Sequence, residues 1–207
     1  MHKHIRLFSV LLIIGLLALS SITSVIAQEN LDNDGIPDSK EQQLALTYKP
    51  SLHFVAGEKF FPTDANYHIE NSVLYMKLGD VNTLIENSPT AASIAQYTTE
   101  DYFLNNTLGG FEEIAQNYKQ NRESFGDKIY AHVTTEAGYI VVQYWFFYAF
   151  NPGTLNQHQG DWEMIEIVLD STETPLYAVY SQHHAGERAE WKDVEKVDET
   201  HQESTWL

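Results

Sequence analysis

Residues 139–150 read YIVVQYWFFYAF, and this stretch decides the fold. Its β-branched and aromatic residues are typical of strands, and they occupy both sets of alternating positions. A membrane-spanning helix needs about 20 apolar residues, so the stretch is too short to cross a bilayer. A strand that is apolar on both faces is too hydrophobic to be exposed. We therefore expect residues 139–150 to form the central buried strand of a two-layer β structure.

Similar strand patterns lie on both sides of this stretch, bounded by Gly, Pro, Asn or Asp. They cover residues 52–55, 72–78, 129–136, 161–170 and 176–183. Helical patterns are fewer and cover residues 39–48 and 111–121, with short helical turns expected between residues 81 and 104. No internal repeat or long linker follows residue 28. The sequence thus predicts a mostly β, β-sandwich-like domain at residues 49–207 with a few short helices.

The first 27 residues have the layout of a signal peptide. Lys3 and Arg6 precede the apolar run 7–19, and Ala27 offers a small residue before the cleavage point. The alternative is an uncleaved anchor, but four Ser and Thr residues dilute the second half of residues 7–26. We expect cleavage, a secreted or extracytoplasmic protein, and no stable transmembrane span after cleavage.

Composition narrows the classes of partner. The formal net charge is −17, with 12 Lys and Arg against 29 Asp and Glu, so nucleic acid is a poor partner and cations are favoured. The chain has no cysteine, which excludes disulfides, thiolate metal sites and cysteine nucleophiles. Stability must therefore come from the core and from any bound metal.

Residues 30–41, NLDNDGIPDSKE, fit the twelve-residue template of a calcium-binding loop. The glycine at position six permits the sharp turn that brings several carboxylates together. The alternative is a solvated acidic tail, but matching by position is more demanding than acidity alone. The predicted Ca2+ ligands, at positions one, three, five, seven, nine and twelve, are Asn30, Asp32, Asp34, the Ile36 carbonyl, Asp38 and Glu41. With residues 42–48 this loop forms a unit at residues 28–48.

A second group of candidate ligands lies at the start of the expected strand 161–170. Asp161 and Glu163 alternate in line with core-type residues, and two carboxylates so placed need a cation or a raised pKa. His158 lies three residues earlier, within reach of the same point. One interpretation is a second divalent-cation site, for Ca2+ or Mg2+, formed by His158, Asp161 and Glu163. The other is an ion pair with Arg188 or Lys192 in a polar network.

Histidines also end the next expected strand. His183 and His184 point to opposite faces if the strand continues, so at most one of them can join a site with Asp161 and Glu163. A histidine at the end of a strand more often has a hydrogen-bonded structural role than a ligand role. His184 is the less favoured additional ligand.

These motifs carry three resemblances. LDNDGIPDSKE resembles the acidic loops of thrombospondin type 3 repeats and dockerin-like segments, which implies a calcium role. Residues 48–201 resemble exported prokaryotic members of the vacuolar protein sorting-associated protein 62 family. The motifs YKPSLHFVAGEKFFPTD, HQGDWEMIEIVLD and YSQHHAGERAEWKDVEKVDETH carry this likeness. Members of that family continue through further strands, so we expect the C-terminal strands to be missing after QESTWL.

A narrower resemblance is to necrosis-inducing peptide-like proteins, whose GHRHDWE motif implies a divalent-metal site on a β-sandwich that engages sphingolipids. His158, Asp161 and Glu163 match its spacing, but Gln157 and Gly160 replace the motif's Gly and second His. The resemblance also implies an upstream aspartate ligand, for which Asn151 is the nearest candidate.

Three functions follow from these residues. We favour a non-enzymatic, calcium-stabilised binding domain that recognises a glycan, a lipid headgroup or a cell-surface protein through residues 158–163. The first alternative is a divalent-metal-dependent hydrolase, in which His158 and Asp161 hold the cation and Glu163 is the catalytic general base. No HExxH, GxSxG or phosphate-binding glycine loop supports it. The second alternative is a purely structural surface protein.

Overall fold

The computed structural model of this chain describes residues 29–153, 156–182 and 185–197. The expected signal peptide, His183, His184 and the last ten residues lie outside these ranges. No helix in the described ranges is long and apolar enough to cross a membrane.

Five antiparallel strands form the main sheet, in the order β4-β5-β6-β7-β8. β5 lies inside the sheet and pairs with β4 on one side and β6 on the other. Val142 and Ala149 of β5 have no exposed surface, which confirms the buried strand expected at residues 139–150. The strands are β4 Tyr130–Glu136, β5 Tyr139–Asn151, β6 His158–Leu169, β7 Pro175–Gln182 and β8 Ala185–Glu190.

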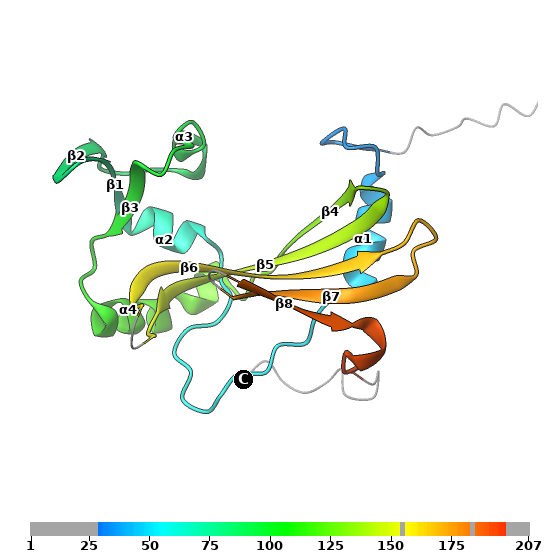
Figure 1. Cartoon of the computed structure of the whole chain (residues 1–207). Helices are drawn as coiled ribbons and strands as arrows, with labels where there is room; N and C mark the ends of the chain where they lie inside the picture. Colours follow the sequence, from blue (N-terminus) through cyan, green and yellow to red (C-terminus); the bar gives the residue numbers. More distant parts are fainter. Residues whose placement is uncertain (1–28, 154–155, 183–184, 198–207) are drawn as a thin grey trace, which may run out of the picture.

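A second, smaller antiparallel sheet has the order β2-β1-β3. Its strands are β1 Ser72–Leu78, β2 Val81–Glu86 and β3 Tyr102–Asn106. Figure 1 shows this small sheet above one end of the main sheet, with α4 below that end and α1 at the other end. The helices are α1 Asp38–Thr47, α2 Asn66–Glu70, α3 Ala91–Ile94 and α4 Phe111–Phe125, followed by the 3-10 turn Trp191–Asp193. Two antiparallel sheets with a few helices confirm the predicted mostly β, sandwich-like class.

The hydrophobic core has two clusters. In the first, Leu44 of α1 packs on one face of the main sheet, against side chains that include Val142, Tyr144 and Ile167. In the second, α4 packs against Phe60 and the end of β5 through Ile114 and Tyr118. Different helices therefore pack against the two ends of the main sheet, α1 at one end and α4 at the other.

Several segments differ from the secondary structure expected for them. Residues 52–55 form no strand. Pro50, just before them, has no N–H to donate to a neighbouring strand. Gly57, just after them, has φ at 91° and turns the chain. The short helical turn expected between residues 81 and 104 is present as α3, but residues 81–86 and 102–106 are strands, because each pairs with β1. The polar segment 185–190 was not expected to be a strand, but it forms β8 by pairing with β7.

Candidate functional site

The N-terminal loop turns sharply before α1. Gly35 has φ at 98° and Asn33 has φ at 61°, so both residues take the left-handed conformation that such a turn requires. Within the turn, the Asp34 Oδ1 atom accepts a hydrogen bond of 2.7 Å from the Ile36 backbone N–H. The Asp38 Oδ1 atom accepts one of 2.9 Å from the Leu31 N–H. These bonds fix the loop backbone and leave other side-chain oxygens available.

Three carboxylates converge in this loop. Asp32, Asp34 and Glu41 each place one oxygen within 4.8 Å of the other two. No other group of three His, Asp or Glu side chains in the described ranges brings its ligand atoms this close. Positions three, five and twelve of the calcium template therefore meet at one point.

Two buried oxygens at the same loop have no partner. The Oδ1 atom of Asn30 and the Oδ2 atom of Asp34 are buried and accept no hydrogen bond from any residue that the structure describes. A buried acceptor without a donor is costly, and a cation would satisfy both atoms. Burial and then the nearby carboxylates of Asp32, Asp34 and Asp38 raise the pKa of Glu41. The donor set is all oxygen, as hard cations such as Ca2+ require, so the loop fits the ion predicted for it.

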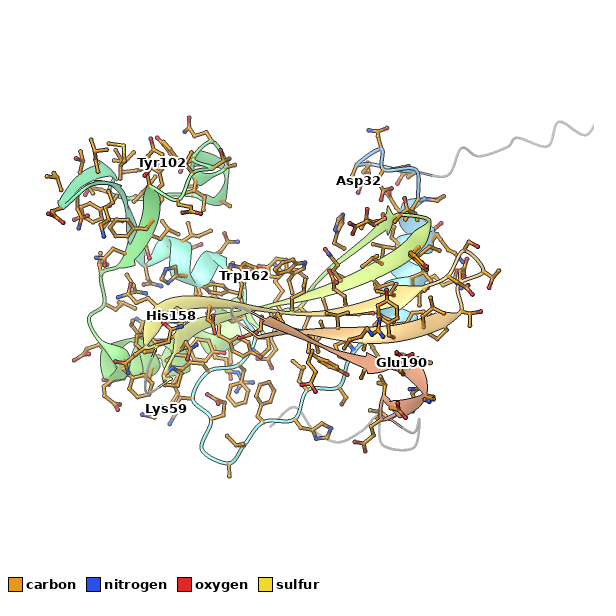
Figure 2. All side chains as sticks on the ribbon, viewed as in Figure 1. Asp32, Lys59, Tyr102, His158, Trp162 and Glu190 are labelled. Atoms are coloured by element: carbon orange, nitrogen blue, oxygen red, sulfur yellow. The ribbon has the colours of Figure 1, made fainter. Side chains whose placement is uncertain are left out.

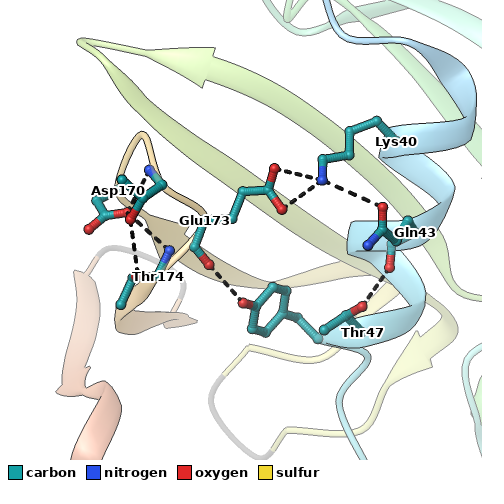
Figure 3. Close-up of polar contacts among 8 residues, drawn as sticks. Lys40, Gln43, Thr47, Asp170, Glu173 and Thr174 are labelled. Carbon is teal, nitrogen blue, oxygen red and sulfur yellow. Dashed lines mark hydrogen bonds and ion pairs between the residues drawn. The ribbon is translucent and has the colours of Figure 1, made fainter.

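Helix α1 attaches this loop to the main sheet. The Tyr144 hydroxyl of β5 donates to the Ala45 carbonyl at 2.8 Å, and Leu44 is buried beside it. The Lys40 ammonium lies 2.6 Å from Glu173, in the turn between β6 and β7. Figure 3 shows this ion pair. The Tyr48 hydroxyl donates to the Glu173 carbonyl at 3.0 Å. The position of the loop is thus coupled to the packing of the domain.

The second group of predicted ligands is only partly assembled. The His158 Nε2 atom lies 3.2 Å from the Asp161 Oδ1 atom, and Asn151 donates to the other Asp161 oxygen at 3.1 Å. The Asp161 side chain is 14% exposed. The His158 Nδ1 atom lies 2.9 Å from the Asn156 carbonyl, which fixes the orientation of the ring. His158, Asp161 and Asn151 therefore form one polar cluster.

Glu163 belongs to a different contact. It lies opposite Phe146 in the sheet, whereas His158 lies opposite Asn151, and it accepts a hydrogen bond of 2.9 Å from the Ser181 hydroxyl. Burial, then Glu163, Glu58 and Asp161, raise the pKa of Tyr148, which lies opposite Asp161 in the sheet, to about 12. Arg188, the alternative ion-pair partner, lies 3.0 Å from Glu190. His184 is outside the described residues, so a second cation site at this end of the sheet stays a prediction.

Two residues near this cluster carry no signal in the sequence. Gly160 has φ at 65°, and a Cβ atom there would lie 3.4 Å from the Nε2 atom of His68 in α2. The His68 ring also packs on Phe147, with 5.9 Å between ring centroids. The left-handed glycine thus allows α2 to approach the main sheet closely. A contact between residues so far apart in the chain could not be inferred from spacing.

Comparison with known proteins identifies no family for this chain. No family model and no curated protein matches it. A solved structure described as "Toxin fold for microbial attack and plant defense" is similar over 30% of this chain and 31% of its own, with 20% identity and a TM-score of 0.28. "NLPPya in complex with glucosamine" is similar over 31% of this chain and 32% of its own, with 24% identity and a TM-score of 0.29.

A third structure, "NLPPya in complex with mannosamine", gives 23% identity and a TM-score of 0.28 over 30% of this chain and 31% of its own. The chain therefore spans about a third of the length of these structures. The likenesses to the vacuolar sorting family and to dockerin-like loops stay predictions.

Proposed function

We propose that this protein is an exported, calcium-stabilised β-rich binding domain. The observation that carries the calcium role is the convergence of Asp32, Asp34 and Glu41 at template positions, beside the unpartnered buried oxygens of Asn30 and Asp34. Three carboxylates at this spacing repel one another unless a cation lies between them. One Ca2+ in the loop would remove that repulsion and fix the start of α1.

Calcium in this loop acts on the whole domain, because α1 contributes Leu44 to the main core. Binding to the folded state alone stabilises it by about 2.7 kcal/mol when free calcium exceeds its Kd about 100-fold. For a chain of this size, that stabilisation raises the Tm by roughly 5 to 10 °C. Mg2+ demands a tighter octahedral shell and gives a smaller increase.

The test is thermal unfolding of the purified protein in EDTA, in CaCl2 and in MgCl2. We expect the Tm increase in CaCl2 to disappear in Glu41→Gln and to persist in Glu123→Gln, which changes an exposed acid on α4. Elemental analysis after dialysis against calcium should give one ion per chain for the parent protein and none for Glu41→Gln. An equal calcium response in the two variants would contradict the loop site.

The binding role is proposed for the β-rich part, with a glycan, a lipid headgroup or a cell-surface protein as the ligand class. A hydrolase would need Glu163 beside a cation held by His158 and Asp161, whereas Glu163 accepts a hydrogen bond from Ser181. The polar cluster around Asp161 is better suited to holding β6 against β5. We therefore propose binding rather than catalysis.

A further inference from the structure

The two faces of the main sheet differ in what covers them. Alternate residues of a strand point to opposite faces, and Val142, Tyr144 and Phe146 of β5 point into the first core cluster. The residues between them, Gln143, Trp145 and Phe147, point to the other face. Helix α2 covers one end of that face, where His68 packs on Phe147. Further along the same face, Trp145 and Gln143 are only half-buried.

An exposed tryptophan stands on this second face. Trp162 of β6 is 46% exposed, and Figure 2 shows it on the side of the main sheet where the small sheet also projects. Three rings support the indole from the sheet. Its centroid lies 5.1 Å from Phe147, 5.4 Å from Tyr130 and 6.4 Å from Trp145. These four residues, Tyr130, Trp145, Phe147 and Trp162, form an aromatic platform that is fixed below and open to solvent above.

A polar row borders the platform. His132, Gln143 and Glu166 are neighbours on β4, β5 and β6, two residues along the strands from Tyr130, Trp145 and Met164. Gln143 donates to Glu166 at 2.7 Å, and its carbonyl oxygen lies 3.3 Å from the His132 Nδ1 atom. The indole N–H of Trp145 approaches the same Gln143 oxygen at 3.4 Å, which joins platform and row. The platform and the polar row are two residues apart along the strands, or about 7 Å.

The chemistry of this surface selects among ligands. A lipid tail or an apolar peptide would satisfy the indole but would remove the polar row from water without offering it any further hydrogen bonds. An anionic ligand would meet the Glu166 carboxylate and a chain of net charge −17. A neutral sugar complements both parts, because a pyranose presents an apolar C–H face to an aromatic ring and hydroxyl donors around its edge.

We propose that the aromatic platform and the polar row together bind a neutral oligosaccharide. One pyranose stacks on Trp162, and the chain continues over Trp145 to donate hydroxyl hydrogen bonds to Glu166 and Gln143. The distance from Trp162 to Glu166, four residues of strand or about 14 Å, favours an oligosaccharide over a single sugar. This proposal rests on the proposed function in one respect, that the β-rich part binds a ligand, and it places the ligand on the opposite face from Asp161.

The experiment is native gel electrophoresis of the full protein, with CaCl2 present, in gels that contain a soluble polysaccharide. The neutral probes are hydroxyethyl cellulose, xylan, galactomannan and mixed-linkage β-glucan, and carboxymethyl cellulose is the anionic probe. We expect retardation in at least one neutral gel and none in the anionic gel. Trp162→Ala should migrate as in a gel without polysaccharide, and Trp162→Phe should recover part of the retardation. Phe54→Ala is the matched control, since Phe54 is an exposed aromatic residue between α1 and α2.

Several results would overturn the proposal. They are the absence of retardation in every neutral gel, equal retardation of Trp162→Ala, or stronger retardation in the anionic gel. A parent protein that sediments as a dimer, with Trp162→Ala a monomer, would instead make this face a contact between copies. Equal thermal stability of the parent and Trp162→Ala excludes misfolding as the cause of a loss. Calcium binding is read separately, from the Tm increase that Glu41→Gln removes.

Discussion

His68 shows how one side chain can join two parts of this molecule. It is 6% exposed, its Nδ1 atom has no hydrogen-bond partner among the described residues, and its ring lies over Gly160 and Phe147. Burial lowers the pKa of His68 to about 4, so the ring is neutral at pH 7. It acts there as a packing group between α2 and β6, and its protonation would place a charge in the core.

The first prediction at this scale is a loss of stability in mild acid. Because the folded-state pKa lies below the usual value of about 6.5, the unfolded chain binds a proton first as the pH falls. The contribution of neutral His68 to the free energy of unfolding is fully present above pH 6.5 and is lost as the pH falls toward 4. Between pH 7 and pH 5 the free energy of unfolding decreases by about 2 kcal/mol through this residue. Urea unfolding at these two pH values should show a smaller difference in His68→Gln than in the parent. His53→Gln, at an exposed histidine, should keep the parent's difference.

At the scale of the element, α1 links the acidic N-terminal loop to the sheet. Pro37, which precedes α1, provides no side-chain cap, and the first turn carries Asp38 and Glu41, so the helix begins at the loop's own carboxylates. One face of α1 buries Leu44, while Leu46 is 61% exposed. Lys40 and Tyr48 bind the turn between β6 and β7 from either end of the helix. Tertiary packing, more than helix propensity, therefore stabilises α1.

We predict that Leu44→Ala destabilises the protein by about 2 to 5 kcal/mol, because it leaves a cavity between α1 and the sheet. Leu46→Ala, on the same helix but in solvent, should change the free energy of unfolding by less than about 0.5 kcal/mol. Denaturant unfolding in CaCl2 measures both. Equal effects of the two substitutions would contradict the packing of α1 on the main sheet.

At the scale of the whole molecule, the two sheets differ in how they are held. The main sheet has a core on one face, and α1 and α4 pack against its ends. The small sheet exposes Leu78, Val81 and Leu84 and joins the rest through α2 and the bond from the Asn106 N–H to Gln159 at 2.8 Å. Thr107 also donates its N–H to the Asn71 carbonyl at 2.9 Å. Elements with few buried apolar contacts open more readily than core strands.

Amide hydrogen exchange should therefore separate the two sheets. We predict that β1, β2 and β3 exchange faster than β5 and β6 at pH 7, because opening the small sheet exposes little additional apolar surface. Mass spectrometry of peptides after timed labelling measures this difference. Gln159→Ala, which removes the bond to Asn106, should speed exchange in β3 and leave the centre of β5 unchanged. Similar protection in both sheets would show that they open as one unit.

Parts of this fold follow from short stretches of sequence. The strands at residues 72–78, 129–136, 139–150, 161–170 and 176–183 and the helices at residues 39–48 and 111–121 agree with β1, β4, β5, β6, β7, α1 and α4 to within a few residues at their ends. Alternation and helical periodicity are local patterns, so they can be read without knowing the partners. The acidic loop is also local, because the carboxylates that converge in it lie within twelve residues and the turn that gathers them is set by Gly35.

Pairing and burial depended on distant residues. β2, β3 and β8 are strands because β1 and β7 offer them an edge, and residues 52–55 had the composition of a strand but found no such edge. The group His158, Asp161 and Glu163 is close in sequence, yet the sheet register sends Glu163 to Ser181 and leaves His158 with Asp161. The burial of His68 and the exposure of Trp162 likewise depend on which elements cover each face. Local patterns in the sequence were enough to place β1, β4–β7, α1 and α4 and to bring out the acidic loop, because neighbouring residues set periodicity and turn geometry. The pairing of β2, β3 and β8 and the contacts and exposure of individual side chains required the tertiary structure, because they join residues far apart in the chain.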